Sequence, residues 1–407
     1  IPMPQLDVFS RDYLRLLLEI HAHHIDGYVD SYYGPAELKA EVEAALPQKP
    51  AELLAIITDL RGRIPDGDPA RAAFLTVALR GVDCTIRMLN GEEFHYLDEV
   101  YRIYDVRPEL IPESRFAAAH RELDTALPRG EGDPAARLHA WRKQFEIDAG
   151  RALPLLELAR VETRRRTTPA IIELPEDESV EITLVNGQPW TAYNWYLGNG
   201  RSLIEFNTDM PMSAAGLIGT FAHEGYPGHH TEHMLKEMVL YREKGYAEQA
   251  AALLHSPTAV ISEGVATTAI QMIFPDGSHH DWNAEVLFPA TGLPVEPDTA
   301  EQQRRLNRAL EALRYVSGNA AILYHTGQLT REQTIDYIRT HGLTSAARAE
   351  KSFSFISHPL YRSYPFTYTI GYDLIRATPD PAATFRRLLT EQVLPSELAA
   401  MGNQHGQ

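Results

Sequence analysis

The sequence has a single cysteine, Cys84, among 407 residues. The chain therefore cannot form an internal disulfide or a cysteine-ligated zinc site. A lone cysteine suits a reducing compartment, and the opening IPMPQLDVFSRDY lacks the charged-then-apolar pattern of a signal peptide. We expect a cytoplasmic protein. Because the chain starts at Ile1, an exported form with a missing leader stays open.

Long apolar runs and an excess of basic charge are also missing. No apolar run approaches the roughly 20 residues that span a bilayer. The chain has 38 lysines and arginines against 55 aspartates and glutamates, a formal net charge of −17. Such a charge repels phosphate backbones and anionic lipid. We therefore expect neither nucleic acid nor a membrane as a partner; the sequence does not reveal the oligomeric state.

Most of the chain has helical periodicity. Apolar residues recur at spacings of three and four over residues 7–29, 69–89 and 133–164. This predicts a mainly α, large helical fold. The stretch 169–178, PAIIELPEDE, is typical of a linker. We therefore expect an N-terminal helical region over 1–170 and a second, catalytic region over 171–407.

The pattern changes between about 178 and 208. Three short runs rich in β-branched and aromatic residues are separated by Asn186-Gly187 and Asn199-Gly200, which are strong hairpin signals. They predict a small antiparallel β-meander, with the run RSLIEFNTDMP as an edge strand beside the next helix. Helices are predicted over 213–245, 246–254, 256–273 and 301–327, and another from Thr330 with Gln333 completing a capping box. Residues 274–300 are predicted as a connection, with the pair His279-His280 in a solvated loop, and the tail 401–407 as disordered.

The octapeptide HEGYPGHH, residues 223–230, resembles a zinc-binding helix but breaks its rule. A zinc helix usually carries two histidines four residues apart, whereas Pro227 occupies that position. On an unbroken helix His229 would lie about 9 Å along the axis from His223, and His230 about 10.5 Å. Zinc–nitrogen bonds are about 2 Å, so neither pair could share an ion.

Pro227 changes this geometry, because it lacks the amide that would continue the helix. Gly228 supplies a permissive backbone for a bulge of one or two residues. With that bulge, His229 can reach the position of the second histidine of a zinc helix. The alternative is a proline-kinked helix with surface histidines.

A third ligand follows in the segment SPTAVISEGVATTAIQMIF, residues 256–274. Glu263 is the only charged residue in this otherwise apolar helix, so it must be paired, protonated or bound to a metal. Gly264 beside it permits close approach of another helix. Two histidines and a following glutamate leave one position of a tetrahedral zinc ion open for water. The alternative is a salt bridge to an arginine.

Glu224 points about 100° away from His223 on a helix. In zinc hydrolases a glutamate next to the first ligand is the general base. These residues predict a zinc-dependent metallopeptidase that hydrolyses small peptides with a metal-activated water. The alternative is a non-catalytic helical binding protein on a peptidase scaffold, although a binding protein needs no base at Glu224.

The motif HEGYPGHH with SEGVA resembles the bacterial family called domain of unknown function 885, whose members are similar to gluzincin metallopeptidases. Looser similarity covers YVDSYYGP (28–35), LYHTGQLTREQTIDYI (323–338) and YTIGYDLIR (368–376). The resemblance implies a helical peptidase with Zn²⁺ on His223, His229 and Glu263, Glu224 as base and Tyr368 as the donor to the tetrahedral oxyanion. His230 remains an alternative to His229, and Tyr364 and Tyr372 remain alternatives to Tyr368.

Overall fold

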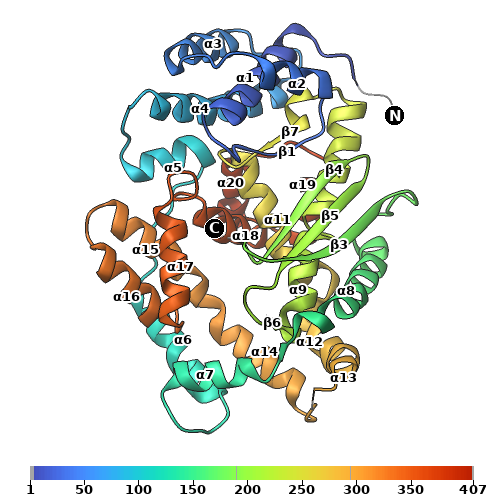
Figure 1. Ribbon diagram of the computed structural model, residues 1–407, viewed down its shortest axis with the longest axis vertical. Coiled ribbons are helices and arrows are strands. Elements are labelled where there is room, and N and C mark those ends of the chain that lie inside the picture. Colours follow the sequence, from blue (N-terminus) through green and yellow to red (C-terminus); the bar gives the residue numbers. More distant parts are fainter. Residues whose placement is uncertain (1–3, 189, 294, 406–407) are drawn as a thin grey trace.

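The computed structural model describes residues 4–188, 190–293 and 295–405 and is mainly α-helical (Figure 1), which confirms the predicted fold class. The N-terminal half contains α1 (Val8–His23), α2 (Ala36–Ala44), α3 (Pro50–Gly62), α4 (Pro69–Leu89), α5 (Tyr96–Tyr104), α6 (Glu113–Ala126), α7 (Pro134–Lys143) and α8 (Ala149–Ala170). None of the described helices is long and apolar enough to cross a membrane.

The helices of the second half carry the predicted zinc residues, on α9, α10 and α11. They are α9 (Ala214–Glu224), α10 (His229–Leu235), α11 (Pro257–Ile273), α12 (His279–Trp282), α13 (Phe288–Thr291), α14 (Thr299–Leu310), α15 (Val316–His325), α16 (Arg331–His341), α17 (Ala346–Ser357), α18 (Pro365–Arg376), α19 (Pro381–Leu388) and α20 (Pro395–His405). A π-helical turn over Lys236–Glu243 continues α10. Thr330 and Gln333 form the predicted capping box of α16.

Three small sheets accompany the helices. One pairs β1 (Val29–Tyr32) with β7 (Ala251–Leu253), and a second pairs β2 (Glu146–Ile147) with β6 (Met212–Ser213). The third contains β3 (Ser179–Val185), β4 (Ala192–Gly198) and β5 (Arg201–Asn207) in the order β3-β5-β4. It lies beside α8 and α9 (Figure 1).

The predicted antiparallel meander is wrong in its strand order. Only β4 and β5 form the predicted hairpin, whereas β3 runs parallel to β5. The turn at Asn186-Gly187 does not return the chain to β3, because residues after β5 hold that end: Thr208 N donates to Val185 O (2.9 Å) and Asp209 accepts from Gly187 N. The edge strands are therefore β3 and β4, whereas β5, which begins the run RSLIEFNTDMP, is central.

Several helix predictions also need correction. Residues 133–164 are split into α7 and α8 by β2, and 246–254 forms a short 3₁₀ turn followed by β7, since β1 offers it a pairing partner. The connection 274–300 contains α12 and α13, and the helix expected over 301–327 is interrupted between α14 and α15. The tail is helical as far as His405; residues 406 and 407 lie outside the described part.

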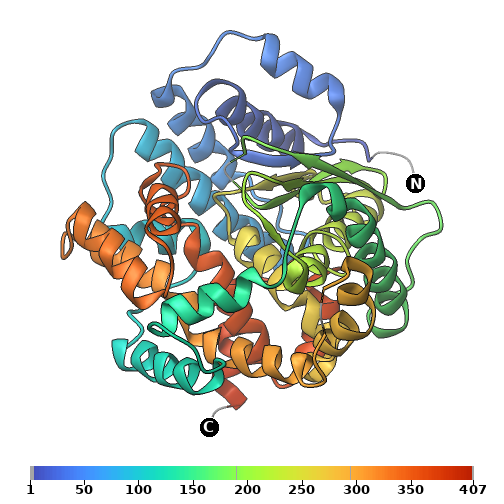
Figure 2. The same ribbon diagram turned by 60° about the horizontal axis from the view of Figure 1, so that its bottom comes forward.

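Helix α11 runs through the middle of the molecule with α18 against it (Figures 1 and 2). Gly264 and Gly371 make this crossing close: a Cβ on Gly371 would lie 2.2 Å from the carbonyl oxygen of Val260, and one on Gly264 2.7 Å from the carbonyl carbon of Gly371. The close approach predicted at Gly264 is therefore present, and it brings α18 next to Glu263.

The largest hydrophobic core crosses the boundary predicted near residue 170. Buried residues from both regions pack in it, among them Leu17 of α1, Leu156 of α8, Phe221 of α9 and Val265 of α11. Helix α8 packs against α9 and α11 across the same boundary. The N-terminal helices therefore support the helices that carry the predicted zinc ligands.

Candidate metal centre

The motif HEGYPGHH separates two helices rather than forming a bulge within one. Helix α9 ends at Glu224 and α10 begins at His229, and the Tyr226–Pro227 peptide bond between them is cis. Gly228 N donates to the carbonyl oxygen of Ala222 (3.0 Å), which folds the connection back onto α9. The expected result is nevertheless present, because the rings of His223 and His229 are 4.8 Å apart, centroid to centroid.

Gly228 is where this connection is tightest. A Cβ there would lie 1.9 Å from the carbonyl oxygen of His223 and 2.5 Å from that of Ala222. Because both are backbone atoms, Gly228→Ala must displace α9 relative to α10. We expect at least a tenfold loss of zinc affinity and a loss of about 1–3 kcal/mol in the free energy of unfolding, as for other overpacked sites.

Zinc titration and thermal unfolding measure these two effects. Gly219→Ala is the matched control, since it lies on α9 and its Cβ would meet nothing within 4 Å. The control should keep zinc affinity and gain up to about 1 kcal/mol, as glycine-to-alanine changes in helices do. A Gly228→Ala protein with wild-type affinity and stability would contradict the role assigned to this glycine.

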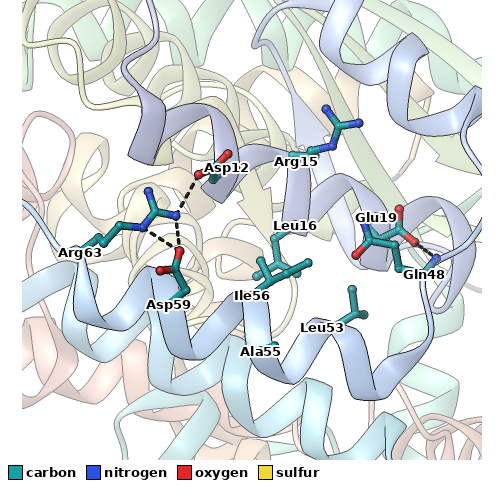
Figure 3. A pocket seen from close by; sticks show the side chains of 10 residues that line it. All are labelled: Asp12, Arg15, Leu16, Glu19, Gln48, Leu53, Ala55, Ile56, Asp59 and Arg63. Carbon is teal, nitrogen blue, oxygen red and sulfur yellow. Dashed lines mark hydrogen bonds and ion pairs between the residues drawn. The ribbon is translucent and has the colours of Figure 1, made fainter.

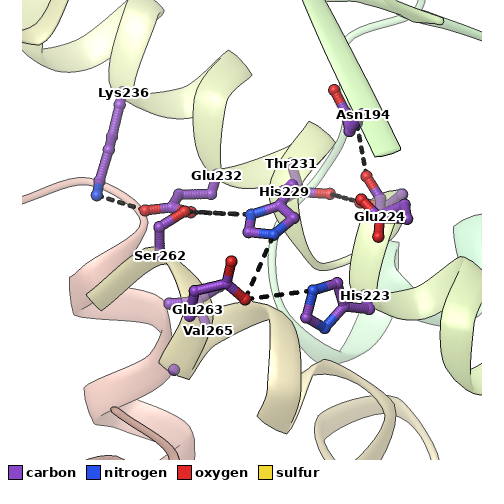
Figure 4. A network of polar contacts seen from close by, with 12 residues as sticks. Asn194, His223, Glu224, His229, Thr231, Glu232, Lys236, Ser262, Glu263 and Val265 are labelled. Atoms are coloured by element: carbon purple, nitrogen blue, oxygen red, sulfur yellow. Dashed lines mark hydrogen bonds and ion pairs between the residues drawn. The ribbon is translucent and has the colours of Figure 1, made fainter. Parts of the chain in front are cut away.

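Three predicted ligands come together in the structure (Figure 4): His223, His229 and Glu263, which we call the triad. One ligand atom from each lies within 4.8 Å of the other two. Glu263 Oε2 is 3.4 Å from His223 Nε2 and 3.8 Å from His229 Nε2. This oxygen is buried and accepts no hydrogen bond. Two imidazole nitrogens and an unsatisfied carboxylate oxygen facing one point are a donor set that fits zinc.

Neighbouring side chains orient two of these three residues. The other ring nitrogen of His229, Nδ1, is 3.1 Å from Ser262 Oγ, whose hydroxyl donates to Glu232 Oε2 (2.5 Å). Glu232 is in turn bound by Lys236 (2.5 Å; Figure 4). Tyr364 donates to Glu263 Oε1 (2.8 Å). These contacts direct His229 Nε2 and Glu263 Oε2 toward the centre, as outer-shell partners do in metal sites.

The local charge is negative, which favours a cation. Burial alone would lower the pKa of His229, but its interaction with Glu232 and the charges of Glu263 and Glu224 raise it to about 9. Burial would raise the pKa of Glu263, yet its interaction with His223, the charge of His229 and the hydrogen bond from Tyr364 lower it. The carboxylates thus stabilise positive charge at the point where the three donors meet.

Glu224 stands out among the buried acids. Within the described residues, the other buried aspartates and glutamates each lie within ion-pair distance of an arginine, lysine or histidine, and Glu224 has no such partner. Burial, opposed by the charges of His223 and His229, raises its pKa. Its backbone carbonyl accepts from Asn194 Nδ2 of β4 (2.6 Å). Glu224 therefore has a fixed backbone and a carboxylate not committed to an ion pair.

The three tyrosines of α18 and its N-cap have different surroundings. Tyr364 is bound to Glu263, and Tyr372 is only 2% exposed and bonds Gln271 and Glu311 instead. Tyr368 is 38% exposed, with its ring 6.4 Å from that of His223. Of the three, Tyr368 is therefore the tyrosine that lies beside the triad and is open to solvent.

His230 is fully buried and its two ring nitrogens are both taken. Nδ1 is 2.8 Å from Ser202 Oγ, and Nε2 is 3.0 Å from Glu178 Oε2. Glu178 also accepts from Tyr226 and Arg164, and these hydrogen bonds outweigh burial and lower its pKa to about 2. Of the two adjacent histidines, His229 therefore belongs to the triad. His230 instead binds Ser202 of β5 and Glu178, which precedes β3. Glu178 was missed because it lies in the predicted linker, where no sequence signal marks it.

The other features singled out in the sequence do not join the centre. His279 and His280 lie in α12 rather than in a loop, and His280 bonds Gln303 and Asn307. A surface cavity of about 400 Å³ lies between α1 and α3 (Figure 3), and no residue of the triad lines it. Three of its charged groups bind each other, since Arg63 pairs with Asp12 and Asp59.

Comparison with known proteins supports the fold alone. No family model matches the chain, and no curated protein matches it. A solved structure from Colwellia psychrerythraea, described as a "putative lipoprotein", is 16% identical with a TM-score of 0.50 and covers 87% of this chain. One from Shewanella oneidensis, described as a "putative lipoprotein of unknown function", is 13% identical with a TM-score of 0.49 and covers 100% of it. The chain spans 66% of the Colwellia protein and 74% of the Shewanella protein.

Proposed function

We propose that the protein is a zinc-dependent metallopeptidase that hydrolyses small peptides, as its resemblance to the domain-of-unknown-function 885 family implies. The observation that carries the proposal is the convergence of His223, His229 and Glu263, with Glu263 Oε2 buried and unsatisfied. A zinc ion held by these residues would lower the pKa of a water molecule at its open position and polarise a peptide carbonyl.

Glu224 supplies the base. It follows His223 directly, has no cationic partner among the described residues, and has a pKa raised by burial, which increases its affinity for a proton. It takes a proton from the attacking water and gives it to the leaving amine. Asn194 fixes the main chain of Glu224 through the bond to the carbonyl oxygen.

Tyr368 and β4 provide the remaining parts. Tyr368 is exposed beside His223, where its hydroxyl donates to the oxyanion that develops on the peptide carbonyl. Strand β4 is paired on one side only and is joined to α9 through Asn194. Its free edge offers main-chain hydrogen bonds to an extended peptide.

Metal analysis and peptide digestion test this function together. Protein purified without added metal should contain stoichiometric zinc and cleave members of a peptide library, and chelation should stop cleavage until zinc is returned. Stoichiometric zinc without cleavage of any peptide would favour the alternative, a non-catalytic binding protein on a peptidase scaffold. Protein that takes up no zinc would contradict the centre itself.

We propose that the protein is cytoplasmic, since a single cysteine, Cys84, suits a reducing compartment. The alternative is an exported form, to which the descriptions of the two similar structures point. Fractionation of the source cells, with an antibody against the chain, distinguishes the two compartments.

A further inference from the structure

Asp30 lies at an irregular point of β1. In the pairing of β1 with β7, Val29 is opposite Leu253 and Ser31 is opposite Ala252, so Asp30 is an extra residue without a partner. Such a bulge turns a side chain out of the regular alternation of a strand, and bulges are frequent next to active sites. Here it brings the Asp30 carboxylate to Tyr193 of β4, whose hydroxyl donates to Oδ1.

The Asp30 carboxylate lies near the metal centre: its partner Tyr193 precedes Asn194 on β4, and Asn194 Nδ2 donates to the main-chain carbonyl of Glu224. Burial raises its pKa to about 6 against the hydrogen bond from Tyr193, and the charges of His229, Glu263 and Glu224 also act on it. It is partly buried, and no arginine, lysine or histidine of the described residues lies within ion-pair distance. A carboxylate in such a place is costly without a cation. A cation from outside the chain would complete it.

A cavity of about 230 Å³ is lined by Asp30 and lies between β1 and β4. Both strands are paired on one side only within the described residues, and three aromatic residues also line the cavity: Tyr32 of β1 and Trp195 and Tyr196 of β4. Ser31, which also lines it, is 8% exposed and its Oγ has no hydrogen-bond partner. Aromatic walls around one carboxylate are the surroundings that ammonium and guanidinium groups prefer.

Two basic residues at the cavity are already engaged. Lys39 lies 3.8 Å from Glu43, one turn further along α2. His21 Nδ1 accepts from Val29 N (3.3 Å), and burial together with the charge of Lys39 lowers its pKa. Neither of them therefore neutralises Asp30. Both line the cavity, where a bound peptide can contact them.

We propose that Asp30 binds a positively charged group of the substrate, either the free amino terminus or a lysine or arginine side chain next to the cleaved bond. This inference rests on the proposed peptidase function and adds its substrate class. Asp30 is then a specificity-determining residue: it selects cationic peptides, with Tyr193 holding the carboxylate in place and the space between β1 and β4 receiving the adjoining residue.

The test uses three peptides of one parent sequence on the zinc-loaded protein: lysine with a free amino terminus, lysine with an acetylated terminus, and norleucine with a free terminus. We measure kcat/KM for each, and Kd by calorimetry on the Glu224→Gln variant, which keeps the carboxylate of Asp30. The peptide carrying the selected cation should be preferred by about 10- to 100-fold, the usual value of a charged hydrogen bond. Comparing the first peptide with each of the others shows which cation Asp30 binds.

Asp30→Asn should remove this preference by lowering kcat/KM for the peptide that carries the selected cation. Asp26→Asn is the control. Asp26 is exposed and Tyr193 bonds Asp30 instead, so replacing Asp26 removes the same charge nearby and leaves that bond in place. Tyr193→Phe should reduce the preference partly. Zinc content and thermal unfolding of each variant verify that the centre and the fold persist.

The outcomes separate the two proposals. Cleavage of all three peptides with equal kcat/KM and equal Kd would overturn the role of Asp30 and leave the peptidase standing. Failure to cleave any of them would count against the peptidase, and the Kd values would still decide Asp30. Loss of zinc from Asp30→Asn would also overturn this inference, since Asp30 would then belong to the metal site.

Discussion

Glu224→Gln is expected to lower kcat for peptide cleavage by about 10²–10⁴-fold, the usual contribution of a general base, while zinc stays bound. Glutamine has the same shape but cannot accept the proton. The ligand set does not change, because Glu224 makes no ion pair and its bond to Asn194 uses the main-chain carbonyl. Initial rates on a peptide that the wild type cleaves, together with zinc content, measure the effect.

Glu243→Gln is a suitable control for this variant. Glu243 is exposed on the π-helical turn that continues α10, so the change removes one negative charge outside the centre. Its rate should stay within about twofold of the wild type. Unchanged cleavage by Glu224→Gln, with zinc present, would remove this residue from the mechanism.

His229→Gln is expected to weaken zinc binding by roughly 100- to 1,000-fold or more. Binding of a structural zinc is worth about 10–16 kcal/mol, so one of three protein ligands accounts for several kcal/mol. The neighbouring His230→Gln provides a close comparison, because His230 bonds Ser202 and Glu178 and does not face the triad. It should keep zinc affinity and lose about 1–3 kcal/mol of unfolding free energy.

Competition titration with a zinc chelator gives the affinities, and denaturant unfolding gives the stabilities. The two variants should therefore differ. His229→Gln loses zinc, and His230→Gln loses stability in the absence of zinc. The reverse result, with zinc lost from His230→Gln and kept by His229→Gln, would show that the two histidines exchange roles when the ion binds.

The local sequence predicted much of the candidate site because its signals are local. Pro227 and Gly228 imply an interruption after His223, whatever packs around them, and an isolated charge in an apolar helix marks Glu263. The form of the interruption was not predictable to the same degree: a bulge and a break between two helices both satisfy the proline, and contacts of Gly228 with the backbone of α9 decide between them.

The strand pairing shows where local sequence patterns do not decide the structure. The turn signal at Asn199-Gly200 forms its hairpin, yet the equally strong one at Asn186-Gly187 does not, because Thr208 and Asp209 bind the end of β3. Residues 246–254 have a helical pattern, but only a 3₁₀ turn forms there, and Ala251–Leu253 pair with β1 as β7. In both places a partner distant in sequence outweighs a local preference of a few tenths of a kcal/mol per residue.

The sequence by itself therefore determined the helical class of the protein and the residues able to hold a metal, since helix periodicity and the chemistry of side chains belong to short segments. Only the tertiary structure decided the rest. It paired Glu178 with His230, 52 residues apart, and Asp30 with Tyr193, 163 residues apart. No spacing rule links such residues. They meet only when burial of the core brings α8, β1 and the sheet β3-β5-β4 together around α9 and α10.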